Sequence, residues 1–260
     1  MNNEKCKVLN LFNLFIYPGL VLIILLSFSA CSGSKKLNRA LANPEGVKKL
    51  RITYAHLDSL PKEIGKLTNL KTLYLFRNGL TAIPDEIGNL KNLETLVISS
   101  NHLTKIPSSI GNLTKLKKIS FKHNRIKSLP AEIGNLVKLR ELDLAYNHIE
   151  KIPPTIGNLK NLGFLYLNEN NIKAIPHEIG KMENLRFLVI GKNDLTELPE
   201  ELGNLSQLIE LNVAFCGPMV EIPETLKHCD KLEVLYIDQS LLMSFPARSV
   251  NPRLKVVLSQ

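Results

Sequence analysis

The sequence has no tryptophan and little cysteine. Its 260 residues include four Cys, 14 Gly and 14 Pro. Four cysteines are too few for a fold built on disulfide bonds. The glycine and proline contents are too low for a collagen-like or low-complexity chain, and a hydrophobic share of 44% excludes wholesale disorder. We therefore expect one or two domains, each with a hydrophobic core.

The N-terminus has the pattern of an export signal. Two lysines precede an uncharged run, residues 8–34, that ends in small residues around Cys31. A basic start, an apolar middle and a small-residue end are typical of a secretory signal peptide. The segment Ser29-Ala30-Cys31 resembles the lipobox of bacterial lipoproteins, although Phe28 stands where Leu is usual. Relaxed lipoboxes of this kind are typical of spirochaetes and Bacteroidetes.

The lipobox resemblance implies a signal peptide over residues 1–30 and attachment of fatty acyl chains such as palmitate at Cys31. Two alternatives stay open. The uncharged run exceeds the roughly 20 residues that span a bilayer, so it could be an uncleaved single-pass anchor. Cleavage after Ser29 would instead release a soluble secreted protein. All three interpretations place residues 35–260 outside the cytoplasm, and the first predicts the bacterial outer membrane or cell surface.

A unit of 23 residues recurs through the rest of the chain. One copy reads LKTLYLFRNGLTAIPDEIGNL over residues 70–90. The residues that recur with this period are prolines (Pro61, Pro84, Pro107, Pro130, Pro153, Pro176 and Pro199), glycines (Gly65, Gly88, Gly111, Gly134, Gly157, Gly180 and Gly203) and asparagines (Asn78, Asn101, Asn124, Asn147, Asn170 and Asn193). A fixed period of roughly 20–50 residues is typical of solenoids and related arrays.

The unit resembles the leucine-rich repeat, whose pattern is Leu-x-x-Leu-x-Leu-x-x-Asn. The added Ile/Leu-Pro-x-x-Ile-Gly segment resembles a subclass found in bacterial proteins, including spirochaete and Bacteroidetes lipoproteins, and in eukaryotic Ras-pathway scaffolds. The resemblance implies an α/β fold, a right-handed solenoid with parallel strands on the concave face and short helices or 3-10 turns on the convex face. We expect a linker and N-terminal cap over residues 31–46, then about nine repeats and a C-terminal strand stub over residues 47–260.

The residue types of the unit predict its local structure. Leu73 and Leu75 alternate with outward residues, which is typical of a strand with one buried face. Asn78 can bond backbone groups that the turn after the strand leaves unpaired. Pro84 suits the first turn of a short helix. Gly88 indicates either a positive φ or a close backbone approach.

Two cysteines lie within the repeats. Cys216 fills an asparagine slot and Cys229 fills a core leucine slot, so both are expected to be buried thiols. A disulfide between them is an alternative in an oxidising compartment. The two slots are expected at opposite ends of adjacent strands, which opposes that bond because Cα atoms more than about 7 Å apart cannot be bridged without movement.

We find no motif for catalysis, cofactor binding or metal binding. The sequence has no Gly-x-Ser-x-Gly, phosphate loop or His-Glu-x-x-His segment. His56, His102 and His148 share one slot of alternate repeats, which predicts a separation of ~10 Å, too far for one metal ion. The repeats also leave no residues for a separate catalytic domain. We therefore expect a protein that is not an enzyme.

Three outward positions of each strand are predicted to form the concave face, which solenoids typically use for binding. Exposed aromatic side chains there are typical binding hot spots. The alternative is that they pair across strands and stabilise the sheet. The candidates for partner binding are Tyr74, Phe76, Phe164, Tyr166, Phe187 and Tyr236.

Charge is uneven along the chain, whose formal net charge is +9. Residues 31–138 carry a net charge of +12 and residues 139–260 a net charge of −4. With a lipid at Cys31, the basic half would lie nearest the membrane, where each basic residue gains up to about 1 kcal/mol close to anionic lipid. Chance asymmetry of a solvated surface is the alternative. An export signal makes nucleic acid a poor partner, despite the sequence pI of ≈ 9.3.

These observations predict a monomeric interaction module, anchored at the bacterial cell envelope, that binds a protein on its concave face. One alternative is an envelope scaffold that uses the convex or lateral face. The other is a hydrolase built on the solenoid.

Overall fold

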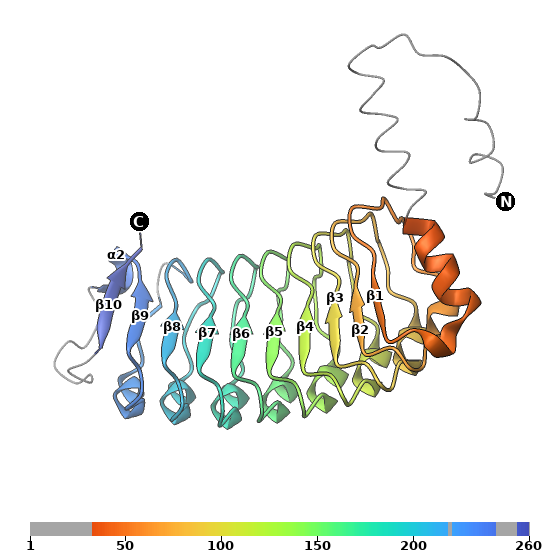
Figure 1. Ribbon diagram of the computed structural model, residues 1–260. Helices are drawn as coiled ribbons and strands as arrows, with labels where there is room; N and C mark the ends of the chain where they lie inside the picture. Colours follow the sequence, from red (N-terminus) through yellow and green to blue (C-terminus); the bar gives the residue numbers. More distant parts are fainter. Residues whose placement is uncertain (1–32, 218–219, 243–253, 260) are drawn as a thin grey trace, which may run out of the picture.

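The computed structural model describes residues 33–217, 220–242 and 254–259. Ten short parallel strands form one open sheet, in which the strands follow chain order (Figure 1). The strands are β1 (Lys49–Arg51), β2 (Thr72–Tyr74), β3 (Thr95–Val97), β4 (Lys118–Ser120), β5 (Glu141–Asp143), β6 (Phe164–Tyr166), β7 (Phe187–Val189), β8 (Glu210–Asn212), β9 (Val234–Ile237) and β10 (Lys255–Leu258). Thus the α/β leucine-rich repeat solenoid expected from the sequence is confirmed.

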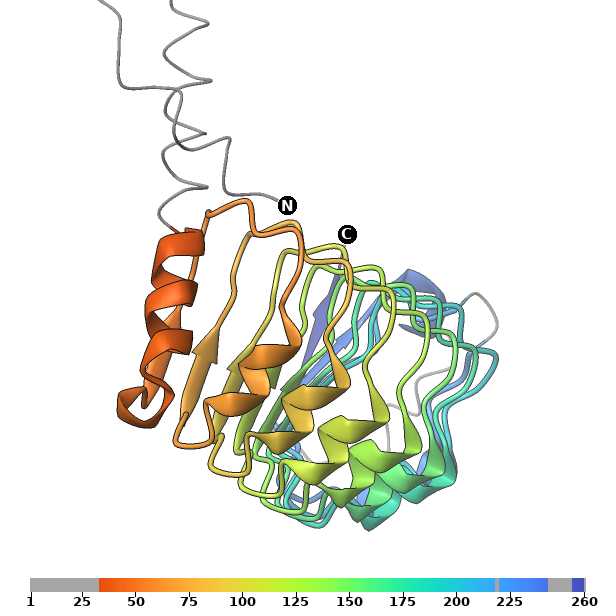
Figure 2. The same ribbon diagram turned by 90° about the vertical axis from the view of Figure 1, so that its right-hand side faces the viewer.

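Short 3-10 helices η2 to η9 stack along the side of the solenoid opposite the sheet, and η1 follows the N-terminal helix (Figure 2). The 3-10 helices are η1 (Pro44–Gly46), η2 (Lys62–Lys66), η3 (Asp85–Asn89), η4 (Ser108–Asn112), η5 (Ala131–Asn135), η6 (Pro154–Asn158), η7 (His177–Lys181), η8 (Glu200–Asn204) and η9 (Glu224–His228). A single turn of α-helix, α2 (Gln239–Leu242), follows β9.

The repeat proline precedes its helix and does not form the first turn. Pro84 has φ −70° and ψ 151°, an extended conformation, and η3 begins at the next residue. The predicted position was therefore wrong by one residue. The proline ring fixes φ near −65°, which the extended region accepts as readily as a helix does.

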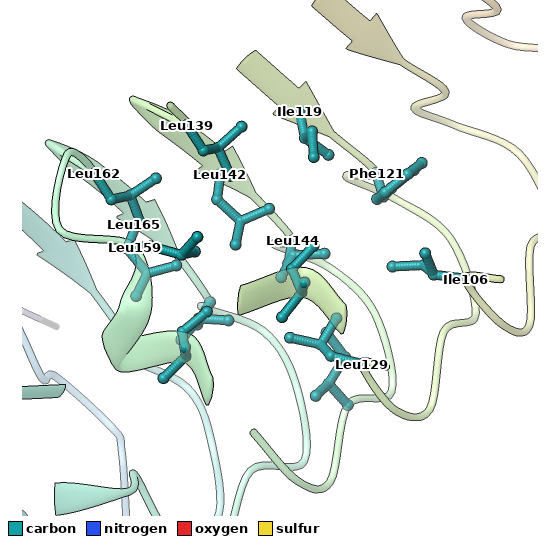
Figure 3. Close-up of a cluster of buried hydrophobic side chains, with 14 of the residues drawn as sticks. Ile106, Ile119, Phe121, Leu129, Leu139, Leu142, Leu144, Leu159, Leu162 and Leu165 are labelled. Atoms are coloured by element: carbon teal, nitrogen blue, oxygen red, sulfur yellow. The ribbon is translucent and has the colours of Figure 1, made fainter. Parts of the chain in front are cut away.

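The core is a stack of identical layers between the sheet and the helices. The middle residue of each three-residue strand is buried, and so is the residue that follows the strand, as Leu73 and Leu75 are in the second repeat. Figure 3 shows Leu142 and Leu144 beside Ile119 and Phe121 of the preceding repeat. A single layer cannot bury its own apolar face, so stability arises from the contacts between neighbours.

The repeat asparagines bond backbone groups near the turn, as predicted, and together form a ladder of side-chain amides. Asn147 donates from Nδ2 to the carbonyl oxygens of Phe121 at 3.1 Å and Leu144 at 3.0 Å. Its Oδ1 accepts the backbone N–H of Ile126 at 3.1 Å. Phe121 and Ile126 belong to the preceding unit, so each amide fastens its own repeat to the one before it.

The repeat glycine allows a close approach between neighbouring helices. A Cβ at Gly134 would lie 2.4 Å from the carbonyl oxygen of Thr155 in η6. No glycine of the described residues has a positive φ, so of the two predicted reasons for the glycine the close approach applies. The left-handed position belongs instead to the residue before the asparagine, such as Arg77 (φ 50°) and Tyr146 (φ 57°).

Both ends of the array depart from the repeat. A helix over residues 33–42 lies against the first repeat, coloured orange-red in Figure 1, and buries Leu37 and Ala40 in the core. Near the other end, the buried carboxylate of Asp238 accepts the N–H groups of Phe215 at 2.5 Å and Ser240 at 2.8 Å. The Asp238 side chain thereby accepts a bond that a backbone carbonyl of the next repeat accepts elsewhere in the array.

Cys216 and Cys229 are buried free thiols, as predicted. The Cys229 thiol donates to the carbonyl oxygen of Leu202 at 3.3 Å. Cys216 has no side-chain amide to continue the ladder, and its own carbonyl accepts the N–H of Leu195 at 2.6 Å.

No helix among the described residues is long and apolar enough to cross a membrane. The predicted signal peptide and Cys31 lie outside those residues.

Candidate binding surface

The outward side of the sheet is the inner, concave side of the solenoid. Parallel strands lie ~4.8 Å apart. The helices on the opposite side need a wider spacing than this, so the solenoid curves with the sheet on its inner side. We call this side the strand face. It comprises the first and third residues of each three-residue strand, the second residue after the strand, and the left-handed residue next to it. In the first eight repeats the left-handed residues are Tyr54, Arg77, Ser100, His123, Tyr146, Glu169, Lys192 and Phe215.

All six aromatic residues predicted from the sequence lie on the strand face and are partly exposed. They are Tyr74, Phe76, Phe164, Tyr166, Phe187 and Tyr236. The structure divides them into two groups and leaves Tyr236 apart, on β9.

The first group, which we call the Phe cluster, consists of Phe164, Tyr166 and Phe187. Phe164 and Phe187 are directly opposite each other on β6 and β7. Their rings are stacked, with centroids 4.9 Å apart and planes 8° from parallel. The guanidinium of Arg186 lies 5.9 Å from the Phe187 centroid. The pair thus stabilises the sheet and still presents apolar surface, so the two interpretations of these residues are compatible.

The second group lies on the first two repeats. The Arg51 guanidinium is 4.7 Å from the Tyr74 ring centroid. Tyr54 and Phe76 meet edge to face with centroids 5.7 Å apart, and the Arg77 guanidinium is 5.5 Å and 5.7 Å from the two rings. We call Lys49 together with these five residues the basic–aromatic patch.

Sequence reasoning missed the left-handed column, which includes the most exposed aromatic residues of this face. Tyr54 is 53% exposed, Phe215 42% and Tyr146 39%. Tyr146 stacks on His123 with centroids 4.2 Å apart. The signal was present in the sequence, because this column is the position just before each repeat asparagine.

The middle of the strand face is polar and internally paired. Lys118 Nζ lies 2.6 Å from Glu141 Oε1. Ser99 Oγ and Ser120 Oγ are 2.8 Å apart, and Ser120 donates to Asp143 Oδ2 at 3.2 Å. Burial raises the pKa of Asp143 despite the bonds that it accepts. These side chains satisfy one another, so we regard them as a structural centre between the aromatic groups.

A shallow hollow lies at the edge of the strand face, at the repeat position that His56 and His102 occupy. Gly79 occupies this slot between His56 and His102 and leaves a space of ≈ 660 Å³. Tyr54 and Arg77 also line it. In the described ranges no three His, Cys, Asp or Glu residues are placed to hold a metal ion.

A family model described as "leucine-rich repeat region" matches residues 21–129 and 123–251 of the chain. The comparison with curated proteins gives no match.

Three solved structures illustrate the similarity to known proteins. A leucine-rich repeat protein of Leptospira interrogans is 28% identical with a TM-score of 0.65, and the match covers 86% of this chain and 75% of that one. The ectodomain of the Arabidopsis thaliana receptor kinase GASSHO1/SCHENGEN3, in complex with Casparian strip integrity factor 2, is 32% identical with a TM-score of 0.66. The plant peptide hormone receptor RGFR1, in complex with RGF2, is 29% identical with a TM-score of 0.72. The matches cover 73% and 81% of this chain but only 24% and 35% of the two plant chains.

Proposed function

Because the chain belongs to the leucine-rich repeat family, we propose that it is a non-enzymatic module that binds a partner protein on its strand face. The observation that carries this proposal is the Phe cluster. Two stacked phenylalanines remain partly exposed on an inward-curved sheet. Aromatic side chains held rigidly in this way are typical interface anchors, since little conformational entropy is lost when a partner covers them. The two plant receptors, which are in complex with Casparian strip integrity factor 2 and RGF2, support a protein or peptide ligand.

The proposal includes a lipid anchor at Cys31 and a position in the bacterial cell envelope. The support is the lipobox-like segment, which ends two residues before the first described helix. A lipid at that point would hold the N-terminal end of the solenoid at the membrane and leave the strand face accessible.

The Phe cluster predicts the effect of a triple substitution. In Phe164→Ala/Tyr166→Ala/Phe187→Ala, the anchor surface is lost while the leucine core is untouched. We expect cooperative thermal unfolding, with a loss of stability of about 1–2 kcal/mol from the missing aromatic pair. Partner binding should weaken by about a hundredfold or more, as is usual when several hot spots are removed.

A photocrosslinking amino acid at position 166, introduced in the native host, tests binding directly. It should yield a specific crosslinked partner, whereas the same group at Val137, which is 49% exposed and lies off the strand face, should not. The purified partner then serves to titrate the triple variant, with Val137→Ala as the matched control. Unchanged affinity in the triple variant would refute the site and direct attention to the convex or lateral face.

A further inference from the structure

The ionic side chains of the strand face are segregated by sign. Over the first four repeats this face carries five cationic side chains and no carboxylate: Lys49, Arg51, Arg77, Lys118 and Lys122. The first carboxylates are Glu141 and Asp143 on β5. Lys118 is neutralised by Glu141 at 2.6 Å. In the part of the chain that the structure describes, the other four cations have no carboxylate within 4.0 Å.

Aromatic rings hold the two guanidiniums of the basic–aromatic patch. Arg51 lies over Tyr74, and Arg77 lies against both Tyr54 and Phe76, whose rings contact each other. A guanidinium over an aromatic face keeps its N–H groups available at its edge for a second partner. The arrangement is therefore compatible with simultaneous stacking and carboxylate binding.

The backbone beneath this patch is also fixed. Tyr54 and Arg77 have φ values of 55° and 50°, in the left-handed region that non-glycine residues rarely occupy. The Tyr54 N–H donates to the Phe76 carbonyl at 3.2 Å, and the Arg77 N–H donates to the Ser99 carbonyl at 3.1 Å. Side chains placed on such a fixed backbone lose less entropy on binding than side chains on a free loop.

The patch continues over the edge of the sheet into the hollow beside Gly79. His56 and His102 flank this hollow, and Asp58 is the single carboxylate of its lining. Arg77 and Tyr54 belong to both surfaces. An extended ligand could therefore contact the patch and place a side chain in the hollow.

We infer that the basic–aromatic patch binds an acidic segment of the partner protein, in an extended conformation, over the first repeats of the strand face. This inference rests on the proposed function and adds the chemistry and position of the ligand. Guanidiniums bind carboxylates in a bidentate geometry, and exposed rings accept the apolar side chains between them. Lys118 is paired with Glu141, so three of the four cations that remain for such a segment lie on the first two repeats.

The chemistry of the patch favours a polypeptide over a membrane. Its guanidiniums lie directly beside partly exposed rings, which suits carboxylates separated by apolar side chains. Anionic lipid is therefore the alternative that the experiment must separate.

The test uses the full-length protein and a fluorescein-labelled peptide of alternating Glu and Ala, with a Lys/Ala peptide as the charge-reversed probe. We expect fluorescence anisotropy to detect binding of the Glu peptide alone, weakening as salt rises from about 10 to 150 mM. The double variant Arg51→Gln/Arg77→Gln should bind the Glu peptide about tenfold more weakly or worse, because two charge-assisted contacts are lost. Arg140→Gln/Arg186→Gln removes the same charge, including a guanidinium stacked on Phe187, and should change affinity less than about twofold.

Equal losses in the two double variants would show a general effect of net charge and overturn the inference. So would failure of the Glu peptide to bind, or equal binding of the Lys peptide. Displacement of the labelled peptide by soluble short-chain phosphatidylglycerol at far lower concentrations than by unlabelled Glu peptide would reassign the patch to lipid headgroups. Loss of the partner in the Phe cluster variant does not depend on these results, so the proposed function can survive failure of this inference.

Discussion

The repeat asparagine shows which residue roles could be predicted from the sequence. Its recurrence at the end of a strand predicts a buried amide that bonds the backbone of a turn. The structure adds that Asn147 and Asn170 each bond to the preceding repeat, since the acceptors include Phe121 and Leu144, both 26 residues earlier. That direction depends on how the repeats stack, and no single repeat contains it.

The two repeat cysteines show how burial changes a titrating group. Burial raises the pKa of the Cys216 thiol to about 12, and the nearby carboxylate of Asp238 adds to the effect. Burial likewise raises the pKa of Cys229 to about 11. In the unfolded chain both thiols would ionise near pH ~8.5.

We therefore predict that alkali destabilises the fold through these thiols. Because their folded pKa values are raised, their contribution to stability is complete below pH ~8.5 and is lost as the pH rises toward about 11 and 12. Each thiol should lower the free energy of unfolding by up to ~1.4 kcal/mol per pH unit within that window. Denaturant unfolding in reducing buffer should show a steeper decline between about pH 8.5 and 10 for the wild type than for Cys216→Ala/Cys229→Ala. Parallel declines would contradict this account.

At the scale of elements, each 3-10 helix from η2 to η8 packs on the next helix through its glycine. Gly134 of η5 lies so close to η6 that a Cβ would be 2.4 Å from the Thr155 carbonyl oxygen and 2.7 Å from the Thr155 Cβ. The first of these contacts is with backbone, so a rotamer change in Thr155 cannot relieve it. The sequence indicated a special glycine here, but only the stacking of the helices identified the reason.

We predict that Gly134→Ala lowers the free energy of unfolding by about 1–3 kcal/mol, because η5 and η6 must move apart. The matched control is Gly163→Ala, at which a Cβ would meet its nearest atom, the Arg140 carbonyl oxygen, at 3.7 Å. That substitution should be neutral or stabilising by up to about 1 kcal/mol, since alanine restricts the unfolded chain. Chemical denaturation of the two variants decides the matter, and a Gly134→Ala protein as stable as wild type would show that the helices separate freely.

At the scale of the whole molecule, repetition made the fold predictable and left the binding surface less defined. Core positions recur in every unit, so a sequence of 23 residues determines the strand, the turn and the helix. The outward positions follow no such rule, as Phe164 and Phe187 stand where neighbouring strands carry Glu141 and Glu210. The sequence shows which positions face outward, but the stacking of the rings and the placement of Arg77 against Tyr54 and Phe76 depend on the assembled sheet.

The proposed lipid anchor has consequences for the entire chain. Cys31 is the first residue of the half that carries a net charge of +12, so lipidation would place the basic repeats nearest the membrane. We predict that the mature protein begins at Cys31, carries diacyl modification and fractionates with membranes, since more than one acyl chain gives stable attachment. Cys31→Ser should abolish the modification and the cleavage that depends on it, while the repeats fold as in the wild type.

Mass spectrometry of the purified N-terminus separates the three interpretations of residues 1–34. A lipidated Cys31 supports the lipoprotein, an unmodified terminus after Ser29 indicates secretion, and an intact Met1 indicates a spanning anchor. The last two outcomes would each overturn the proposed lipid anchor. In either case, the case for the strand face would stand, because the Phe cluster and the basic–aromatic patch are formed within residues 49–187.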